Sequence, residues 1–594
     1  MEIEDWPNLV SLLLGQAEKR PEQPFLWEKR DGAYEPMCWP EVANQLTSLA
    51  AALQSYGLAR GERVMLLSHN SPRWVIADFA IMAAGGVTVP VYTTNTTGNH
   101  AHILNDSGAA MAIISTAALA RPFFEAPRKS RSMKRVIAMG DFGDVDGGHT
   151  VVGTWEEALA EGRAGADAVA QAATEISRDA LACLIYTSGT GGEPKGVMLS
   201  HRAIIANCVG AADVLDELGL CDEVFLSFLP LSHAYEHSAG LMFPVSIGAE
   251  IYFAERADTL TTNLIEARPT IMTAVPRLYE IMRERMLKGL TRQDSLRAKL
   301  FWAAVELGRK RYESRETMTL WERTADRVVD RLVRDKVRAR FGGRLKALVS
   351  GGAPLNYEVG LFFTALGLRL LQGYGQTEAA PLISCNRCGR IKLRTVGPPL
   401  KHVEVRIADD GEVLVRGPLL MDGYWKLPKL TAETVRDGWL HTGDIGVLDH
   451  DGYLQITDRK KDIIVNSAGD TLSPQRIEGV LALEPEIEVA MAVGDNRPHV
   501  VAIVVPRQDF VAEWAKKNGV SADLSALVDD KAFRTAVGRA IDRANGNLSV
   551  TERVKRFVIA DQPFTIENGM MTPTMKPRRH EIIRRWGAAI EELY

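Results

Sequence analysis

Short apolar runs recur along the first 350 residues, and stretches with helical spacing of apolar positions separate them. Four of these runs have the length and composition of buried strands: Arg63–Leu67, Met111–Ile114, 181–186 and 345–350. Strands that alternate with helices usually build parallel sheets covered by helical layers. The pattern therefore predicts an α/β fold with mostly parallel sheets.

Two later segments depart from this alternation. Short strands at 403–407 and 412–415 flank the turn Asp409-Asp410-Gly411 and predict a β-rich subdomain. After a further strand pair, the charged segment 458–462 precedes a new apolar strand. Because a short charged connection between two units can act as a hinge, we expect an N-terminal domain of residues 1–458 and a C-terminal domain of residues 459–594.

The most apolar stretch, residues 74–92, contains Asp78, a Gly85-Gly86 break and Pro90. It predicts a buried helix followed by a strand and not a membrane span. The N-terminal residues are acidic and lack the order of a secretory signal. Six cysteines scattered over 594 residues fit a reducing compartment better than a disulfide framework. We therefore expect a cytoplasmic protein.

Composition adds one asymmetry. A net charge of -5 gives no general affinity for nucleic acid, yet residues 277–346 carry 20 Lys and Arg against 10 Asp and Glu. Apolar residues recur there at helical spacing: Leu296, Leu300, Ala303 and Leu307. Two interpretations remain open. The segment forms solvated helices packed by that apolar face, or it offers a basic surface to anionic lipid or to coenzyme A phosphates.

The segment YTSGTGGEPKG at 186–196 combines hydroxyls, glycines and one lysine between two apolar runs. Such a connection can turn backbone N–H groups toward an anion, and Lys195 adds a compensating charge. A Walker A motif requires Ser or Thr after its lysine, whereas Gly196 follows Lys195 here. The loop therefore predicts a polyphosphate site of another type, with a flexible surface linker as the alternative.

Further motifs follow this loop in order: LPLSHAYEH, VSGGAPL, QGYGQTE, HTGDIG, DRKKD, SAGDTLSPQRIE and ENGMMTPTMK. The series resembles the acyl-adenylate-forming (AMP-binding) superfamily. The segment ILNDSGA, the helical insertion after VPRLYE and the chain's ending resemble bacterial long-chain fatty acyl-CoA synthetases in particular. The chain departs from the family pattern at Gly191, where a second threonine is usual, at Cys385 and Cys388, and at Pro577.

The resemblance implies a small mobile α+β C-terminal domain and a two-step reaction. A long-chain fatty acid is activated by ATP to acyl-AMP and then transferred to coenzyme A, which gives acyl-CoA, AMP and pyrophosphate. ATP, Mg²⁺ and coenzyme A are the implied cofactors, with the fatty acid and coenzyme A as partners. The alternatives are a fatty acyl-AMP ligase that loads a carrier protein, a medium-chain or aryl acid–CoA ligase, and a non-catalytic acyl-nucleotide sensor. A homodimer and peripheral contact with the inner face of the membrane also stay open.

The resemblance also implies residue roles. The phosphate loop comprises Thr187, Ser188, Gly189, Thr190, Gly191 and Lys195. The adenine site comprises Gly351, Gly352, Ala353, Gln372, Gly373, Tyr374, Gly375 and Thr377. Thr187 and Glu378 hold magnesium, for which a carboxylate is a suitable ligand. Asp444 and Arg459 contact the ribose.

Four further residues complete the implied site. His233 borders the acyl carbonyl, and Lys576 bridges the carboxylate and the α-phosphate; with Lys195 they form the catalytic set. Lys461 is the hinge, and Gly469 lines the channel for pantetheine. Taken singly, a residue such as Lys576 is more often a surface lysine, so these roles depend on the whole series of motifs.

Overall fold

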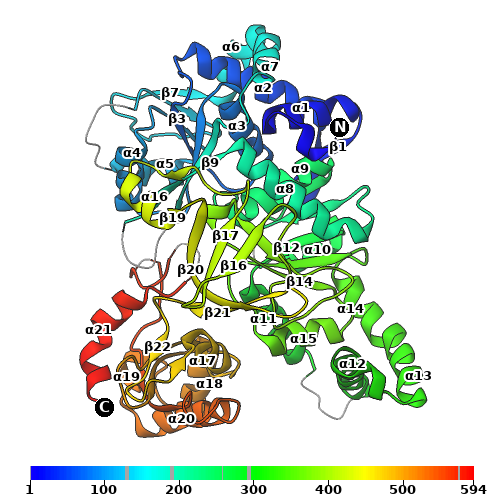
Figure 1. The fold of residues 1–594 in the computed structure, drawn as a ribbon. Helices are drawn as coiled ribbons and strands as arrows, with labels where there is room; N and C mark the ends of the chain where they lie inside the picture. The colour runs from blue at the N-terminus through cyan, green and yellow to red at the C-terminus, as the bar shows by residue number, and fades with distance from the viewer. Residues whose placement is uncertain are drawn as a thin grey trace.

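The computed structural model describes residues 2–126, 133–187, 193–256, 258–290, 296–566, 568–572 and 576–594. Figure 1 shows a large N-terminal part and, below it, a smaller C-terminal part. Three sheets build the first part, and two small sheets with helices build the second. The predicted α/β class, with its β-rich subdomain and small C-terminal domain, is confirmed.

The first large sheet has eight strands in the order β18-β9-β8-β4-β3-β5-β6-β7. Its strands are parallel except at β8–β9 and β9–β18. The predicted apolar stretch forms helix α3 (Pro72–Ala83), buried at all positions but one, and then β4. The strand bounds are β3 (Arg63–Leu67), β4 (Val87–Pro90), β5 (Met111–Ile114), β6 (Arg135–Ala138), β7 (Val151–Thr154), β8 (Leu181–Thr187), β9 (Lys195–Ser200) and β18 (Gly423–Tyr424).

The second large sheet also has eight strands, in the order β15-β14-β13-β12-β10-β11-β1-β2. Its interior is parallel, and an antiparallel pair closes each edge. The strand bounds are β1 (Pro24–Arg30), β2 (Ala33–Cys38), β10 (Val224–Ser227), β11 (Glu250–Phe253), β12 (Ile271–Ala274), β13 (Ala347–Ser350), β14 (Leu370–Gly375) and β15 (Leu382–Cys385).

An antiparallel sheet forms the predicted β-rich subdomain and leads to the C-terminal part. Its strands are β16 (Glu404–Ile407), β17 (Glu412–Arg416), β19 (Val435–Arg436), β20 (Trp439–Leu448) and β21 (Leu454–Arg459). A turn at 460–462 follows β21 directly. The segment 458–462 thus comprises the last two residues of β21 and this turn. That a domain boundary and a hinge lie here stays a prediction.

The C-terminal part has its own apolar cores on both faces of a three-stranded sheet. Its strands are β22 (Ile464–Val465), β23 (Thr471–Leu472), β24 (Ile487–Val493), β25 (Val500–Pro506) and β26 (Val554–Ile559). Its helices are α17 (Pro474–Leu481), α18 (Gln508–Asn518), α19 (Leu524–Leu527), α20 (Lys531–Asn545) and α21 (Arg579–Glu591). The separate cores explain how this part can hold its shape independently of the large sheets.

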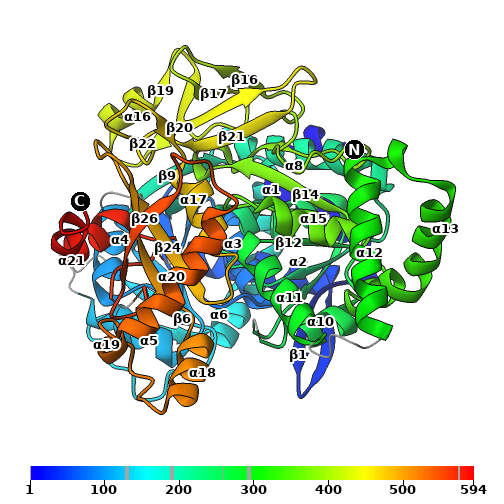
Figure 2. The same ribbon diagram turned by 90° about the horizontal axis from the view of Figure 1, so that it is seen from below.

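The remaining helices lie around the sheets of the N-terminal part, with α13 at its outer edge (Figures 1 and 2). They are α1 (Leu9–Lys19), α2 (Trp39–Ser55), α4 (Thr97–Ser107), α5 (Ala117–Glu125), α6 (Trp155–Gly162), α7 (Ala166–Ala173), α8 (His201–Leu215), α9 (Phe243–Ile247), α10 (Leu260–Ala267), α11 (Pro276–Lys288), α12 (Leu296–Glu313), α13 (Leu320–Val329), α14 (Asp335–Arg340), α15 (Tyr357–Ala365) and α16 (Pro428–Thr434). Within the described ranges, every helix falls short of the length and apolar character needed to cross a bilayer.

Helix α12 forms where the sequence predicts it, but the predicted apolar face is wrong. Ala298, Phe301, Ala304 and Gly308 are buried, whereas Leu296 is 72% exposed. A Cβ on Gly308 would lie 2.2 Å from the carbonyl oxygen of Ala365 in α15. Because α12 and α15 approach this closely, small residues occupy the contact and the leucines of the periodic pattern lie beside it.

Ion pairs join α11 to the C-terminal part. Glu284 pairs with Arg507 at 2.8 Å, and Lys288 pairs with Asp509 at 3.1 Å. Both pairs join residues more than 200 positions apart, so they connect the C-terminal part to the N-terminal part in this arrangement, and exposed pairs of this kind are weak enough to separate. They also account for a share of the charge in the basic segment.

Candidate active site

The predicted phosphate loop connects strands β8 and β9, which form an antiparallel hairpin. Thr187 and Lys195 are cross-strand partners there, so the loop leaves and re-enters the sheet at one point. Ser188, Gly189, Thr190 and Gly191 lie outside the described residues. The Nζ atom of Lys195 lies 5.6 Å from the centroid of the Tyr424 ring.

Tyr424 is a site residue that the sequence analysis missed. It lies in β18, which pairs with β9 and so brings a distant segment beside Lys195. Its hydroxyl donates a hydrogen bond of 2.7 Å to Oε1 of Glu378. Tyr424 therefore connects the lysine of the phosphate loop to the predicted metal ligand. The one signal in the sequence was an aromatic pair after a glycine, which does not reveal the strand pairing.

Three residues from three strands meet around one buried carboxylate. The hydroxyl of Tyr374 donates to Oδ2 of Asp444 at 2.5 Å, and Nε of Arg459 lies 3.1 Å from Oδ1. Asp444 and Arg459 are cross-strand partners in β20 and β21. Burial raises the pKa of Asp444, and the Arg459 charge opposes that shift. The structure thus brings together three residues that the sequence placed around adenine and ribose.

The glycines around this cluster make room for backbone to come close. A Cβ on Gly351 would lie 3.0 Å from the Tyr235 ring, and one on Gly375 would lie 1.9 Å from the carbonyl oxygen of Pro381. Gly352 has a φ of +79° and is exposed beside Ala353. Gly351 and Gly352 follow β13, and Gly375 is the last residue of β14. They therefore lie at the carboxyl ends of parallel strands, where ligands bind in open α/β sheets.

Strand β14, which carries Tyr374, also contributes a buried polar group. Gln372 is buried, and its Oε1 has no hydrogen-bond partner among the described residues. Gly373 next to it cannot carry a side chain without meeting Leu382, since a Cβ would lie 2.9 Å from Cδ1. Thr377, also buried, begins the short turn that carries Glu378. A buried acceptor without a partner among the described residues is a suitable contact for a polar ligand.

His233 lies in the turn after β10, and its ring is half-buried. The backbone N–H of Tyr235 donates to its Nδ1 at 3.1 Å, so the neutral ring carries its hydrogen on Nε2. Burial, together with the charge of Lys576, lowers the pKa of His233 to about 4. His233 is therefore a neutral hydrogen-bond donor at neutral pH.

Behind His233 lies a second residue that the sequence analysis missed. Glu236 is fully buried, and the hydroxyls of Ser227 and Thr273 each donate to it at 2.7 Å. Burial raises the pKa of Glu236 to about 7. The next residue, His237, pairs with the equally buried Asp78 at 3.0 Å. These bonds hold the turn that carries His233. The polar residues in the motif LPLSHAYEH were the one feature of the sequence that could have indicated such buried bonds.

Lys576 reaches this cluster from the C-terminal part. Desolvation and the charge of Arg459 together lower the pKa of Lys576 to about 8, and the charge of Asp444 opposes this shift. Solvent still reaches the residue. The same lysine acts on His233, as described above. These mutual influences indicate that the Lys576 ammonium interacts electrostatically with both His233 and the Asp444–Arg459 pair.

Two predicted residues are not brought to the cluster. Lys461 lies exposed in the turn after β21. Gly469 lies exposed on the loop between β22 and β23, with a φ of +88°. Apart from its chain neighbours, no atom in the described part of the protein lies within 4 Å of the place where its Cβ would stand.

The arrangement suits an anionic nucleotide that reacts with a carboxylate. Lys195, Arg459 and Lys576 supply positive charge from three separate segments of the chain, whereas Asp444 and Glu378 supply acceptors for hydroxyls or a cation. Such fixed charges stabilise a transition state in which phosphate charge moves.

The motifs and this geometry agree with known families. Residues 13–425 match the model described as AMP-binding enzyme, and residues 461–594 match the AMP-binding enzyme C-terminal domain. The chain belongs to the AMP-binding enzyme family. Among its relatives, FadD15 of Mycobacterium tuberculosis, a long-chain-fatty-acid–CoA ligase, is 32% identical over 99% of this chain and 97% of its own. The peroxisomal long chain acyl-CoA synthetase 6 of Arabidopsis thaliana is 31% identical over 95% of this chain and 82% of its own.

Solved structures share the fold. The A domain of a carboxylic acid reductase from Segniliparus rugosus, in complex with AMP and a carboxylic acid, superposes with a TM-score of 0.77 at 22% identity, covering 99% of this chain and 94% of that domain. O-succinylbenzoate CoA synthetase from Bacillus subtilis gives a TM-score of 0.68 at 21% identity, covering 97% and 98%. At these identities the likeness shows the fold and does not select a substrate.

The lowered pKa of Lys576 predicts a pH limit on acyl-AMP formation. Below about pH 8 the ammonium is charged, and above it the charge is lost, so the rate should fall as pH rises through about 8. His233 does not titrate in this range. Pyrophosphate release in a single turnover, measured from about pH 7 to 9.5, checks this. Conversion of supplied acyl-AMP to acyl-CoA is the control and should instead rise with pH, because the thiolate attacks. A flat or rising profile for acyl-AMP formation would refute the prediction.

Proposed function

We infer that this protein is an ATP-dependent long-chain fatty acid–CoA ligase of the AMP-forming type. The observation that carries the inference is the convergence of Lys195, Glu378, Asp444 and Lys576 on one site, in a chain whose relatives with that activity match it over nearly their whole length. The product is acyl-CoA, with AMP and pyrophosphate.

Each step breaks one bond. A fatty acid carboxylate oxygen attacks the α-phosphorus of ATP, the bond to pyrophosphate breaks, and acyl-AMP forms. The thiolate sulfur of coenzyme A then attacks the acyl carbonyl, and the bond to AMP breaks. The residues of the site supply mainly electrostatics and positioning. Lys195 and Lys576 would offset phosphate charge, whereas neutral His233 would donate from Nε2 to the carbonyl side.

We propose that magnesium is held by Glu378 and the hydroxyl of Thr187. Glu378 has no ion-pair partner within 4.0 Å among the described residues, so its carboxylate is available to a cation. The described ranges contain no group of three or more His, Cys, Asp or Glu side chains arranged to hold a metal. The ion would therefore depend on phosphate oxygens and water for its other ligands, as Mg²⁺ commonly does. It would supply charge neutralisation at the phosphates.

We further propose that the part of the C-terminal domain that follows Lys461 rotates about this residue between the two steps. Lys460 bonds Asp410 at 2.6 Å and Glu412 at 3.0 Å, which anchors the residue directly before Lys461 to the antiparallel sheet. Rotation would withdraw Lys576 and bring the Gly469 loop toward the acyl group. The exposed position and positive φ of Gly469 support a loop that accepts pantetheine without obstruction.

The location of the protein and its interaction partners are also proposals. The long acyl chain points to a membrane-derived substrate, which favours peripheral contact of a cytoplasmic enzyme with the inner membrane face. The rival fatty acyl-AMP ligase would share the adenylation residues but use a carrier protein. Medium-chain and aryl ligases would share the fold and differ in the acyl pocket. The oligomeric state stays open.

A substrate panel tests the activity. We expect coenzyme A consumption with long-chain fatty acids at a kcat/KM at least about tenfold above that with acetate or benzoate, because each buried methylene adds favourable apolar transfer. Loss of free thiol, measured for each acid with ATP present, gives the result. Preference for benzoate derivatives would select the aryl alternative, and acyl-AMP formation without thiol consumption would select the acyl-AMP ligase.

Glu378→Gln tests the metal site at nearly constant size. We expect the magnesium concentration for half-maximal acyl-AMP formation to rise by about tenfold or more, because an anionic ligand is lost. Tyr424→Phe is the matched control: it removes the hydrogen bond to Glu378 but keeps the carboxylate, so its magnesium dependence should change far less. An unchanged magnesium midpoint in Glu378→Gln would exclude the residue from the metal site.

Two variants test the rotation. Lys576→Ala should lower acyl-AMP formation by about 100-fold or more, since it removes a charge that acts on the transition state, and should retain most conversion of supplied acyl-AMP to acyl-CoA. Lys461→Pro should spare the first step and depress the second, because proline restricts the hinge dihedral. Among the described backbone hydrogen bonds, none has the Lys461 N–H as donor, so proline breaks no bond. Equal loss of both half-reactions in both folded variants would reject the mechanism.

A further inference from the structure

The outermost helix of the N-terminal part, α13, and the π-helical turn η6 (Asp330–Arg334) that continues it expose apolar side chains in a regular row. Trp321 is 85% exposed, Val328 51% and Leu332 47%. With the exposed Ala325 they occupy positions i, i+4, i+7 and i+11, which lie along one side of a helix. Leu320, beside them, is 81% exposed. We call Trp321, Ala325, Val328 and Leu332 the apolar stripe.

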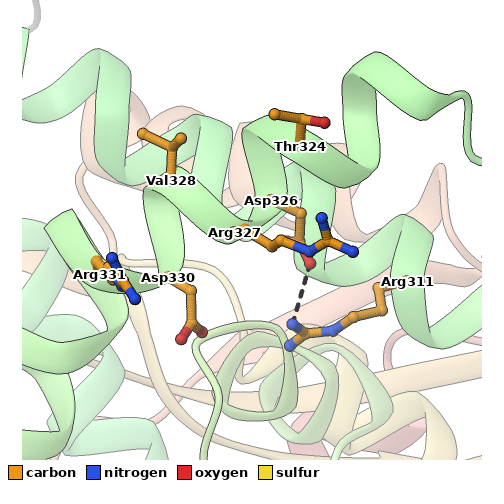
Figure 3. A pocket seen from close by; sticks show the side chains of 7 residues that line it. All are labelled: Arg311, Thr324, Asp326, Arg327, Val328, Asp330 and Arg331. Carbon is orange, nitrogen blue, oxygen red and sulfur yellow. Dashed lines mark hydrogen bonds and ion pairs between the residues drawn. The ribbon is translucent and has the colours of Figure 1, made fainter.

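A row of arginines accompanies the stripe. Arg323, Arg327 and Arg331 follow one another at intervals of four residues and are exposed. No carboxylate lies within 4.0 Å of any of the three among the described residues. Figure 3 shows Arg327 and Arg331 at a surface hollow together with Val328 of the stripe. Unpaired cations and exposed apolar groups thus share the outward surface of one helix.

The acidic residues of the same helix point to the protein. Glu322 pairs with Lys310 at 2.7 Å, and Asp326 pairs with Arg311 at 3.1 Å, the contact drawn in Figure 3. Asp330, in the π-helical turn η6 (Asp330–Arg334), pairs with Arg338 at 2.8 Å. Because the carboxylates are committed to inward pairs, the outward face keeps a net positive charge.

A buried arginine holds this face in place. Arg334 is fully buried and donates to the carbonyl oxygens of Ala304 in α12 at 2.8 Å and Ala365 in α15 at 2.7 Å. It also pairs with Asp326 at 2.6 Å. Both ribbon views show α13 at the edge of the molecule with α12 on its inner side (Figures 1 and 2). The stripe is therefore carried on a fixed platform that points away from the rest of the protein.

We propose that this face of α13 docks on an anionic phospholipid surface. Tryptophan favours the interface between headgroups and acyl chains, and each arginine near an anionic membrane adds electrostatic attraction. A shallow amphipathic helix with these two features lies in the interface plane. The biological reason for docking rests on the proposed function, since a long-chain fatty acid partitions into membranes. Docking itself requires no catalysis.

Vesicle sedimentation of the full-length protein tests the proposal without fatty acid or ATP. We expect binding to phosphatidylcholine vesicles that contain phosphatidylserine, weak binding to phosphatidylcholine alone, and loss of binding with added salt. The triple change Arg323→Gln, Arg327→Gln and Arg331→Gln should lower the partition coefficient by roughly 100-fold, at about fivefold for each arginine. Trp321→Ala should lower it on the order of tenfold.

A matched control carries the same change of charge elsewhere. Arg121, Arg163 and Arg539 are exposed and have no ion pair among the described residues, so their triple change to Gln should leave most binding intact. Equal loss in both triple variants would overturn the proposal, as would equal binding to both kinds of vesicle. A dimer in sedimentation velocity that Trp321→Ala converts to a monomer would overturn it too, in favour of a second copy of the chain.

The outcome is separable from that of the proposed function. Acyl-AMP formation from a water-soluble fatty acid should be unchanged in the arginine triple variant, whereas acyl-CoA formation from acid supplied in anionic vesicles should fall. If no fatty acid is a substrate but vesicle binding follows the variants as expected, the docking surface stands and the proposed function fails.

Discussion

The carboxylate of Asp444 is the point on which the site depends. A buried carboxylate is costly unless it is paired and hydrogen-bonded, and Asp444 has both an arginine and a tyrosine hydroxyl. Its partners come from β14 of a large sheet and from β21 of the antiparallel sheet. The same interaction therefore joins two sheets and sets the charge that Lys576 meets when it arrives from the C-terminal part.

The Asp444–Arg459 pair lies before the proposed hinge in the sequence. Arg459 is the last residue of β21, and the proposed hinge follows two residues later. Asp444, Tyr374 and Arg459 all lie before it, so rotation of the C-terminal part would leave their bonds intact. Only the Lys576 charge would leave. One domain could thus keep its groups around the nucleotide while the other changes the surroundings of the acyl carbonyl.

The sequence predicted the strands well, because continuous apolar runs between turn residues have few other interpretations. Arg63–Leu67 and Met111–Ile114 match the structure residue for residue. It failed on the buried face of α12, since periodicity cannot show that a backbone passes within reach of Gly308. It also missed Tyr424, whose importance arises from pairing between strands that lie more than 200 residues apart in the sequence. Motif order indicated which residues would matter, but only tertiary contacts reveal what holds them.

The basic segment illustrates why net charge alone has little meaning. Part of its positive charge joins domains, as at Lys288, and part is neutralised by buried or inward pairs, as at Arg334. What remains is concentrated on one helix beside exposed apolar groups. A solvated face would expose both signs of charge and few large apolar side chains. Helix α13 instead turns its acids inward and its tryptophan outward. The sequence count could not resolve this separation, which is the ground for proposing a docking surface here.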